Sequence, residues 1–165
     1  MSFEKRIHSR NIFYKEIEMK WSKFRNIWLF KSEPSTWSWQ DQTAKGAAGE
    51  AWDGVRNYQA RNFMRQMQIG DRGFFYHSQG EKAIIGLVEV IQAARPDPTT
   101  DDPKWQCVTI KALQALPNAV SLHQIKALPP LAEMMLVRNP RLSVQPVRVE
   151  EWRIILEISG LNPAS

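Results

Sequence analysis

The chain has 165 residues, of which 43% are hydrophobic and 24% are charged, and its formal net charge is +5. This length fits one folded domain, and the composition is that of a globular protein, which excludes a fibrous or disordered chain. The apolar runs are far shorter than the roughly 18 residues of a membrane span, so we expect a soluble protein without a membrane partner. The positive charge favours polyanionic partners such as nucleic acid.

Cysteine and histidine are too few to suggest a disulfide or a metal centre. Cys107 is the only cysteine, which excludes an intramolecular disulfide, and a reducing cytoplasm is the expected location. We expect its thiol to be buried in the apolar run 105–110. His8, His77 and His123 lack the spacings of metal-binding motifs, so we predict neither a metal site nor a cofactor.

Residues 1–25 differ in composition from the rest of the chain. They are rich in Lys and Arg, with Glu4, Glu16 and Glu18 among them. They lack the apolar stretch of a secretory signal. We expect an N-terminal extension that is poorly ordered or forms a short helix, and we assign it no function.

The next segment predicts a strand and a short helix. The apolar run 27–30, closed by Pro34, is typical of a buried strand. Ser35 or Ser38 can cap a helix that reaches Ala44, after which glycines break the chain.

A second helix and a pair of strands follow. Asn57 is a suitable N-cap for a helix over 58–67. The runs 74–76 and 83–93 predict two strands that pair with each other, with a bulge or a close approach at Gly86.

The last third predicts a loop, a strand and short helices. The Pro- and Asp-rich stretch 95–103 is typical of a surface loop, and the run 105–116 favours a strand that ends at Pro117 and Asn118. Further helices are predicted over 121–126, 131–136 and 149–159. Five or so strands with short helices between them predict an α+β domain, and such strands can curl into a small barrel.

Four short polar strings stand where apolar segments end. Polar side chains at element ends are how a small domain lines a pocket. The strings are residues 31–34 (Lys-Ser-Glu-Pro), 52–58 (Trp-Asp-Gly-Val-Arg-Asn-Tyr), 76–78 (Tyr-His-Ser) and 141–146 (Arg-Leu-Ser-Val-Gln-Pro).

In their order and spacing these strings resemble the EVE domain, a member of the PUA-like superfamily of nucleic-acid readers. The resemblance covers roughly residues 27–161 and implies a PUA-like mixed β pseudobarrel of about five to six strands flanked by short helices. We therefore expect an extension at 1–25, an EVE domain at 26–161 and a tail at 162–165. Because the resemblance begins near Ile27, Met19 is an alternative start.

Seven tryptophans are many for this length, and they fall into two groups. Trp28, Trp105 and Trp152 lie on apolar faces, which predicts core positions. Trp52 instead stands in a polar stretch beside Asn57 and is expected to line a pocket, whereas Trp37 or Trp39 is a candidate for its rim.

The strings supply groups that can hold a base and its phosphates. Trp52 and Tyr58 would contact the face of a base, and the neighbouring polar groups would read its edge. Cationic side chains would neutralise phosphates. The expected base-pocket residues are Lys31, Ser32, Glu33, Pro34, Trp52, Asn57, Tyr58, His77, Ser78, Ser143 and Gln145, and the expected phosphate-binding residues are Arg56, Arg61 and Arg141.

For several of these residues a purely structural role is the alternative. His77 can be a satisfied histidine that caps a loop, and Arg141 and Gln145 can tie the C-terminal helix to the barrel. Arg61 can belong to a solvated face with weak ion pairs.

The resemblance implies a non-catalytic domain, expected as a monomer, that binds DNA or RNA carrying a modified base, with modified cytosine in DNA favoured. Ser32, Glu33, His77 and Ser78 can in principle form a hydrolytic site, but the sequence contains no Gly-x-Ser-x-Gly elbow and no Gly-rich phosphate loop. A small enzyme acting on a nucleotide-like molecule and a protein-interaction module remain the alternatives.

Overall fold

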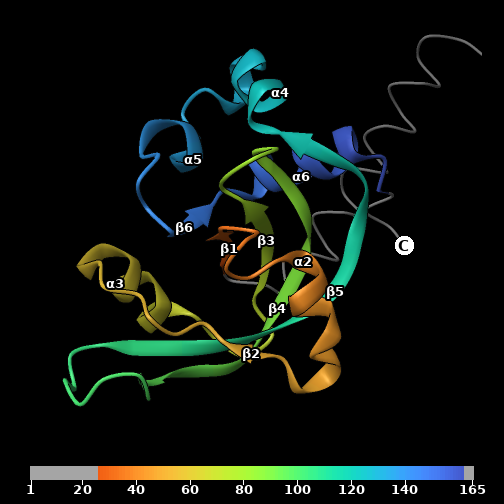
Figure 1. Cartoon of the computed structure of the whole chain (residues 1–165). Helices are drawn as coiled ribbons and strands as arrows, with labels where there is room; N and C mark the ends of the chain where they lie inside the picture. The colour runs from red at the N-terminus through yellow and green to blue at the C-terminus, as the bar shows by residue number, and fades with distance from the viewer. Residues whose placement is uncertain (1–25, 162–165) are drawn as a thin grey trace, which may run out of the picture.

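The computed structural model describes residues 26–161, which form a six-stranded mixed sheet flanked by five α-helices (Figure 1). The predicted N-terminal extension, the alternative start at Met19 and the tail at 162–165 lie outside the described residues. The order of the sheet is β2-β5-β4-β3-β1-β6. Its strands are β1 (Ile27–Ser32), β2 (Glu50–Ala51), β3 (Arg72–His77), β4 (Ala83–Pro96), β5 (Gln106–Ser121) and β6 (Val144–Val147).

The centre of the sheet is buried on both faces. In β1, Ile27 and Leu29 enter one hydrophobic cluster, while Trp28 and Phe30 enter another on the opposite face. The neighbouring β3 alternates in the same way, and β1 and β3 form the one parallel pair of the described sheet. Strands covered on both faces are expected to read as continuous apolar runs, which is how β1 reads in the sequence.

Helices cover the two faces in separate groups. The first cluster is closed by α4 and α6, and the second by α2 and α3. The helices are α2 (Trp39–Ala44), α3 (Tyr58–Gln66), α4 (Leu122–Ala127), α5 (Met135–Arg138) and α6 (Val149–Ser159), with 3-10 turns η1 (Gly46–Ala48) and η2 (Pro129–Leu131). The α+β class and the flanking helices are confirmed.

The predicted helix caps are confirmed. The side chains of Ser38, Asn57 and Ser121 each accept a hydrogen bond from a backbone N–H in the first turn that follows. Each cap therefore fixes where its helix starts.

The strand predicted over 105–116 does not end at Pro117 and Asn118. β5 continues through Pro117 to Ser121, and its pairing with β4 shifts register between Gly86 and Ile84. Residues 116–119 lie opposite Ile85 in this irregular stretch, where Pro117 needs no ladder hydrogen bond.

Three other features of the secondary structure differ from the sequence prediction. β4 runs to Pro96, so the loop predicted from Arg95 begins later. The helix predicted over 131–136 is instead divided into η2 and α5, because the two prolines start a 3-10 turn at η2, where their missing N–H groups cost nothing. The strand β2 was missed, because a two-residue strand that pairs only with β5 carries no periodic signal.

Gly86 is a point of close approach, as predicted. A Cβ built on Gly86 would lie 2.4 Å from the Trp39 ring. Trp39 packs edge-on against Phe75, at 5.4 Å between ring centroids. Only a residue without a Cβ therefore lets α2 sit against the sheet at this position.

Replacing Gly86 with Ala is expected to lower the free energy of unfolding by about 1–3 kcal/mol, because Trp39 must move to admit the methyl group. Chemical denaturation measures this loss. The same change in a Trp39→Leu background should cost much less, and an equal cost in both backgrounds would contradict the role of the Trp39 ring.

Candidate nucleic-acid-binding site

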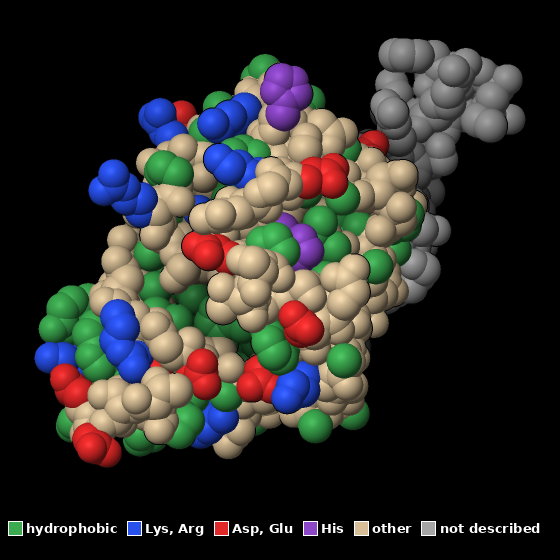
Figure 2. All heavy atoms as spheres, in the orientation of Figure 1, with side chains coloured by type: hydrophobic (Ala, Val, Ile, Leu, Met, Phe, Trp, Pro, Cys, Tyr) green, Lys and Arg blue, Asp and Glu red, His purple; other side chains and the backbone are tan. Residues whose placement is uncertain are grey.

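A cavity of about 420 Å³ opens where the end of β1 meets the segment that contains β2. Figure 2 shows the hollow on this face, with hydrophobic side chains at its bottom and acidic side chains near its rim. This volume is within the usual range for small-molecule sites. The lining residues are Lys31, Ser32, Glu33, Thr36, Trp37, Glu50, Ala51, Trp52, Asp53, Gly54, Val55, Arg56 and Ser143.

The first wall comes from the end of β1. The Lys31 ammonium donates a hydrogen bond to the carbonyl oxygen of Pro140 at 2.7 Å, and burial lowers the pKa of Lys31. The Ser32 hydroxyl donates to the carbonyl oxygen of Trp37. The Glu33 carbonyl accepts from the Trp37 backbone N–H at 2.9 Å, which closes the turn that brings Trp37 to the cavity.

Trp52 forms the aromatic wall of the cavity and is also part of the core. Its side chain is 9% exposed and meets the rings of Phe30 and Phe75 edge-on, at centroid distances of 5.4 Å and 5.9 Å. Its backbone N–H donates to the Val108 carbonyl at 2.7 Å. The sequence analysis treated pocket and core as alternatives for Trp52, and the structure gives it both positions.

A buried carboxylate holds the other wall in place. The Asp97 side chain is fully buried and accepts hydrogen bonds from the Gly54 N–H and from the Arg56 guanidinium, both at 2.8 Å. Burial alone would raise the pKa of Asp97, but hydrogen bonds led by the one from Arg56 outweigh it and hold that pKa well below the usual range. Asp97 therefore stays ionised and fixes residues 54–56 beside Trp52.

Six residues predicted for the base pocket do not line this cavity, and one of them, Tyr58, lies at the start of α3 beside Trp105. Asn57 caps α3, and His77 accepts a hydrogen bond from the Trp39 N–H at 3.1 Å at the start of α2. Ser78 donates its N–H to the Ser32 carbonyl at 2.9 Å. The fully buried Gln145 donates to the Leu142 carbonyl at 2.8 Å, and Pro34 lies in the turn after β1.

These contacts are structural. His77 takes the capping role that the sequence analysis gave as its alternative, and burial lowers its pKa, which favours the neutral imidazole that can accept this bond. These residues hold the surrounding backbone and are not part of the cavity lining.

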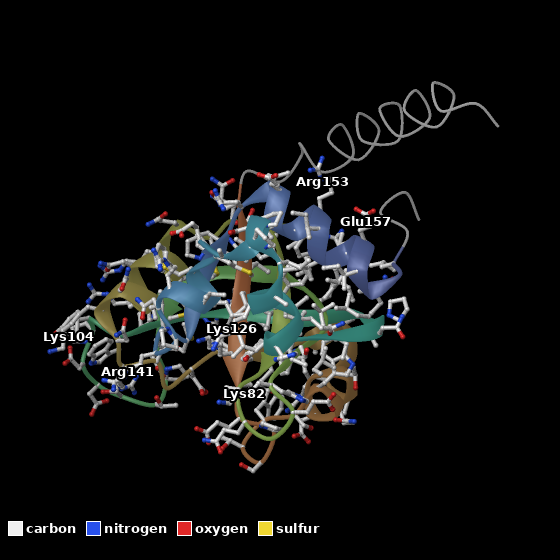
Figure 3. All side chains as sticks on the ribbon, turned by 90° about the horizontal axis from the view of Figure 1, so that it is seen from above. Lys82, Lys104, Lys126, Arg141, Arg153 and Glu157 are labelled. Atoms are coloured by element: carbon white, nitrogen blue, oxygen red, sulfur yellow. The ribbon has the colours of Figure 1, made fainter. Side chains whose placement is uncertain are left out.

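Among the predicted phosphate ligands, only Arg56 lines the cavity. Arg61 lies on α3 with Tyr58, outside the cavity and against Trp105. Arg141 lies in the loop between α5 and β6 and projects in Figure 3 toward the same end of the molecule as Lys104.

The core position predicted for Trp105 is wrong. Trp28 and Trp152 are buried as predicted, whereas Trp105 remains partly exposed beside Tyr58. Its strand-like neighbours suggested burial, but it lies just before β5 in the turn that follows β4. The nearby Cys107 is buried, as predicted.

The sequence analysis missed several lining residues, of which two are carboxylates. Glu50 and Asp53 border the cavity, and burial, followed by the nearby Asp97 and Glu50, raises the pKa of Asp53. Asp53 belongs to the second polar string and Glu50 stands two residues before it, so their closeness to Trp52 in the sequence was the available signal. Of the two rim candidates, Trp37 lines the cavity and Trp39 belongs to the core.

Within residues 26–161 no group of three or more His, Cys, Asp or Glu side chains is arranged to hold a metal ion. None of the helices in this part of the chain has the length and apolar character needed to cross a membrane.

Comparison with known proteins gives consistent matches. The EVE domain model matches residues 26–158. Mouse thymocyte nuclear protein 1 is 35% identical over 171 residues, which cover 84% of this chain and 76% of that protein.

Solved structures agree with this. A crystal structure of a protein from Agrobacterium tumefaciens is 54% identical and superposes with a TM-score of 0.82, covering 83% of this chain and 94% of that one. The crystal structure of human THYN1 in complex with 5-methylcytosine-containing DNA is 33% identical, with a TM-score of 0.76, and covers 81% of this chain and 97% of that one.

Replacing Asp97 with Ala is expected to lower the free energy of unfolding by about 3 kcal/mol, because the change removes a buried charge that accepts several hydrogen bonds. Folding lowers the pKa of Asp97, so its contribution is present at neutral pH and is lost only as the pH falls below about 4. Urea denaturation between pH 8 and pH 5 should therefore show a constant difference. The exposed Asp101→Ala serves as control and should change stability by at most about 0.5 kcal/mol. Equal losses of stability in the two variants would contradict the role of Asp97 in holding residues 54–56.

Proposed function

The chain belongs to the EVE domain family, and on this premise we propose that it is a non-catalytic nucleic-acid-binding domain that holds a modified base, most simply a modified cytosine of DNA, in the cavity beside Trp52. The observation that carries the proposal is the combination of a rigid aromatic wall with hydrogen-bonding groups around one small cavity. The DNA complex of human THYN1 supports it, because that protein has the same fold and family.

The cavity has the groups that a cytosine needs. Trp52 offers a ring for contact with the base, and the carboxylates of Glu33 and Asp53 can accept from the exocyclic amine of cytosine. The Val55 side chain, also in the lining, provides an apolar contact for a methyl group at C5.

Donors for the remaining atoms come from the end of β1. Lys31 borders the cavity, and its ammonium, which gives one of its three protons to Pro140, can donate another to the ring nitrogen or the carbonyl oxygen of a cytosine. The Ser32 hydroxyl donates its proton to the Trp37 carbonyl, so its oxygen can serve only as an acceptor in the cavity. Ser143 lies beside them, and its carbonyl accepts the Lys31 N–H at 2.9 Å. In duplex DNA the base must leave the helix, at a cost of a few kcal/mol that these contacts offset.

The hydrogen-bond partners of Ser32 and His77 favour binding over catalysis. The Ser32 hydroxyl donates to a backbone carbonyl, and His77, one of the four residues considered for a hydrolytic site, accepts the Trp39 N–H and does not line the cavity. A serine nucleophile requires a side chain that acts as a general base within hydrogen-bond reach, and His77 is not in that position for Ser32. A cytoplasmic location and a monomeric state remain predictions.

The test compares oligonucleotides that differ only in one base. We expect wild-type protein to bind a strand with 5-methylcytosine more tightly than the same strand with cytosine or thymine, measured by fluorescence anisotropy at one salt concentration. RNA strands of the same sequence decide between the two nucleic acids. Equal affinity for all bases would contradict modified-base recognition.

Within this test, Trp52→Ala should lose both stability and base preference. Removing the ring costs about 3–5 kcal/mol of folding free energy because it packs on Phe30 and Phe75, and about 1–3 kcal/mol of binding through lost stacking. Trp39→Ala is the matched control, since Trp39 packs on the same Phe75 but does not line the cavity. The folded Trp39→Ala protein should keep the base preference. An equal loss of base preference in both variants would show that the base does not bind beside Trp52.

Replacing Arg61 with Ala is expected to weaken modified and unmodified strands by the same factor and to reduce the slope of log affinity against log salt by about 0.7–0.9, because phosphate contacts carry no base information. Salt titrations of binding measure this slope. Lys126→Ala on α4, shown in Figure 3, is the control and should leave the slope unchanged. A loss confined to the modified strand would instead make Arg61 a base reader.

A further inference from the structure

Two aromatic side chains form an exposed stack outside the cavity. The rings of Tyr58, at the start of α3, and Trp105, just before β5, lie 5.0 Å apart with an angle of 33° between their planes. Tyr58 remains 55% exposed in spite of this contact. An aromatic pair that leaves so much ring surface open contributes little to the core and is available to a planar ligand.

Cations surround this stack. The guanidinium carbon of Arg61 lies 4.9 Å from the centre of the Tyr58 ring, and the Lys104 ammonium lies 5.8 Å from that of Trp105. Arg61 donates its hydrogen bonds to neutral acceptors, the Asn62 side chain and the Lys104 carbonyl. Figure 2 shows hydrophobic and basic side chains over α3 and the β4–β5 loop, with some acidic side chains among them, and Figure 3 labels Lys104 at that end.

The backbone that carries the two rings is held in place before any ligand binds. Asn57 caps α3 and thereby fixes the backbone of Tyr58 at its first position. The Trp105 backbone N–H donates to the Asp102 carbonyl at 3.2 Å, and the Trp105 carbonyl accepts the Asp97 N–H at 3.0 Å. Ordering the backbone at this site therefore costs little on binding.

Arg56 connects the stack to the cavity. It lines the cavity, and its guanidinium carbon lies 5.6 Å from the centre of the Trp105 ring. The same buried Asp97 that pairs with Arg56 also holds the backbone of Trp105. Arg56 thus contacts both the cavity and the aromatic stack.

We propose that Tyr58 and Trp105 form a platform on which the nucleotide next to the recognised base stacks, while Arg61 and Lys104 bind its phosphates. This inference rests on the proposed function, because the neighbouring base is defined by the one in the cavity. Stacking on aromatic rings within a cationic groove is how proteins hold single strands without reading their sequence. Arg61 donates only to neutral acceptors, and Lys104 forms an exposed ion pair with Asp102 at 3.0 Å, a weak pair that a phosphate can replace.

The experiment uses three probes and the full chain. The probes are the nucleoside 5-methyl-2′-deoxycytidine, a 12-nucleotide DNA strand with one 5-methylcytosine, and the same strand with abasic sites on both sides of that base. Affinities of wild-type protein, Tyr58→Ala and Tyr58→Phe are measured by calorimetry and anisotropy, and circular dichroism checks that each variant is folded.

Tyr58→Ala is expected to bind the intact strand about 5- to 150-fold more weakly, the range for the loss of one stacked base. Its affinity for the nucleoside should equal that of wild type, and Tyr58→Phe should keep wild-type affinity for every probe. The abasic strand should bind wild-type protein more weakly, and Tyr58→Ala should weaken it no further.

Two outcomes would overturn the platform. In one, Tyr58→Ala binds the intact strand as wild type does. In the other, it loses the nucleoside and the strand equally, which would place Tyr58 in the pocket. Failure of the proposed function looks different, because wild-type protein would then bind methylated and unmethylated strands equally while Tyr58→Ala still weakened both.

Discussion

The burial of β1 on both faces is the constraint on which the rest of this structure depends. Its alternating side chains enter two hydrophobic clusters, so the strand cannot carry a polar side chain along its centre without a cost of several kcal/mol. Polar groups can stand only at its end or beyond it, as Lys31 and Ser32, the last two residues of β1, and Glu33 do at the cavity. The core thus decides where the candidate site can be.

The second wall, residues 50–56, depends on charge as well as on the hydrophobic packing of Trp52 and Val55. Residues 50–56 have almost no regular structure, and β2 contributes only a two-residue pairing with β5. The buried Asp97 compensates by binding the Gly54 N–H and the Arg56 guanidinium from the end of β4. Such a pair is stable because each lone pair of the carboxylate has a donor, whereas a buried charge with fewer partners would destabilise the fold.

Two aromatic sites with different surroundings lie on either side of Arg56. Trp52 is nearly buried, rigid and bordered by carboxylates, which suits the recognition of one base edge. Tyr58 is exposed and Trp105 partly exposed, and cations lie beside both rings, which suits a backbone and any base. Under the two proposals made above, this separation would give selectivity to one site and general affinity to the other.

The sequence by itself determined the α+β class, the caps at Ser38, Asn57 and Ser121, and the close approach at Gly86, because each depends on local pattern and backbone chemistry. The polar strings also marked both walls of the cavity. Only the tertiary structure decided which residues of each string face inward.

His77 and Gln145 have side chains as suitable for a base as those of Lys31 and Asp53, but packing of α2 and β6 turned them to backbone partners. Trp105 lies outside the core in which it was predicted for the same kind of reason, because the loop between β4 and β5 places it beside Tyr58. Side-chain direction depends on contacts between segments far apart in the sequence, and local patterns do not contain those contacts.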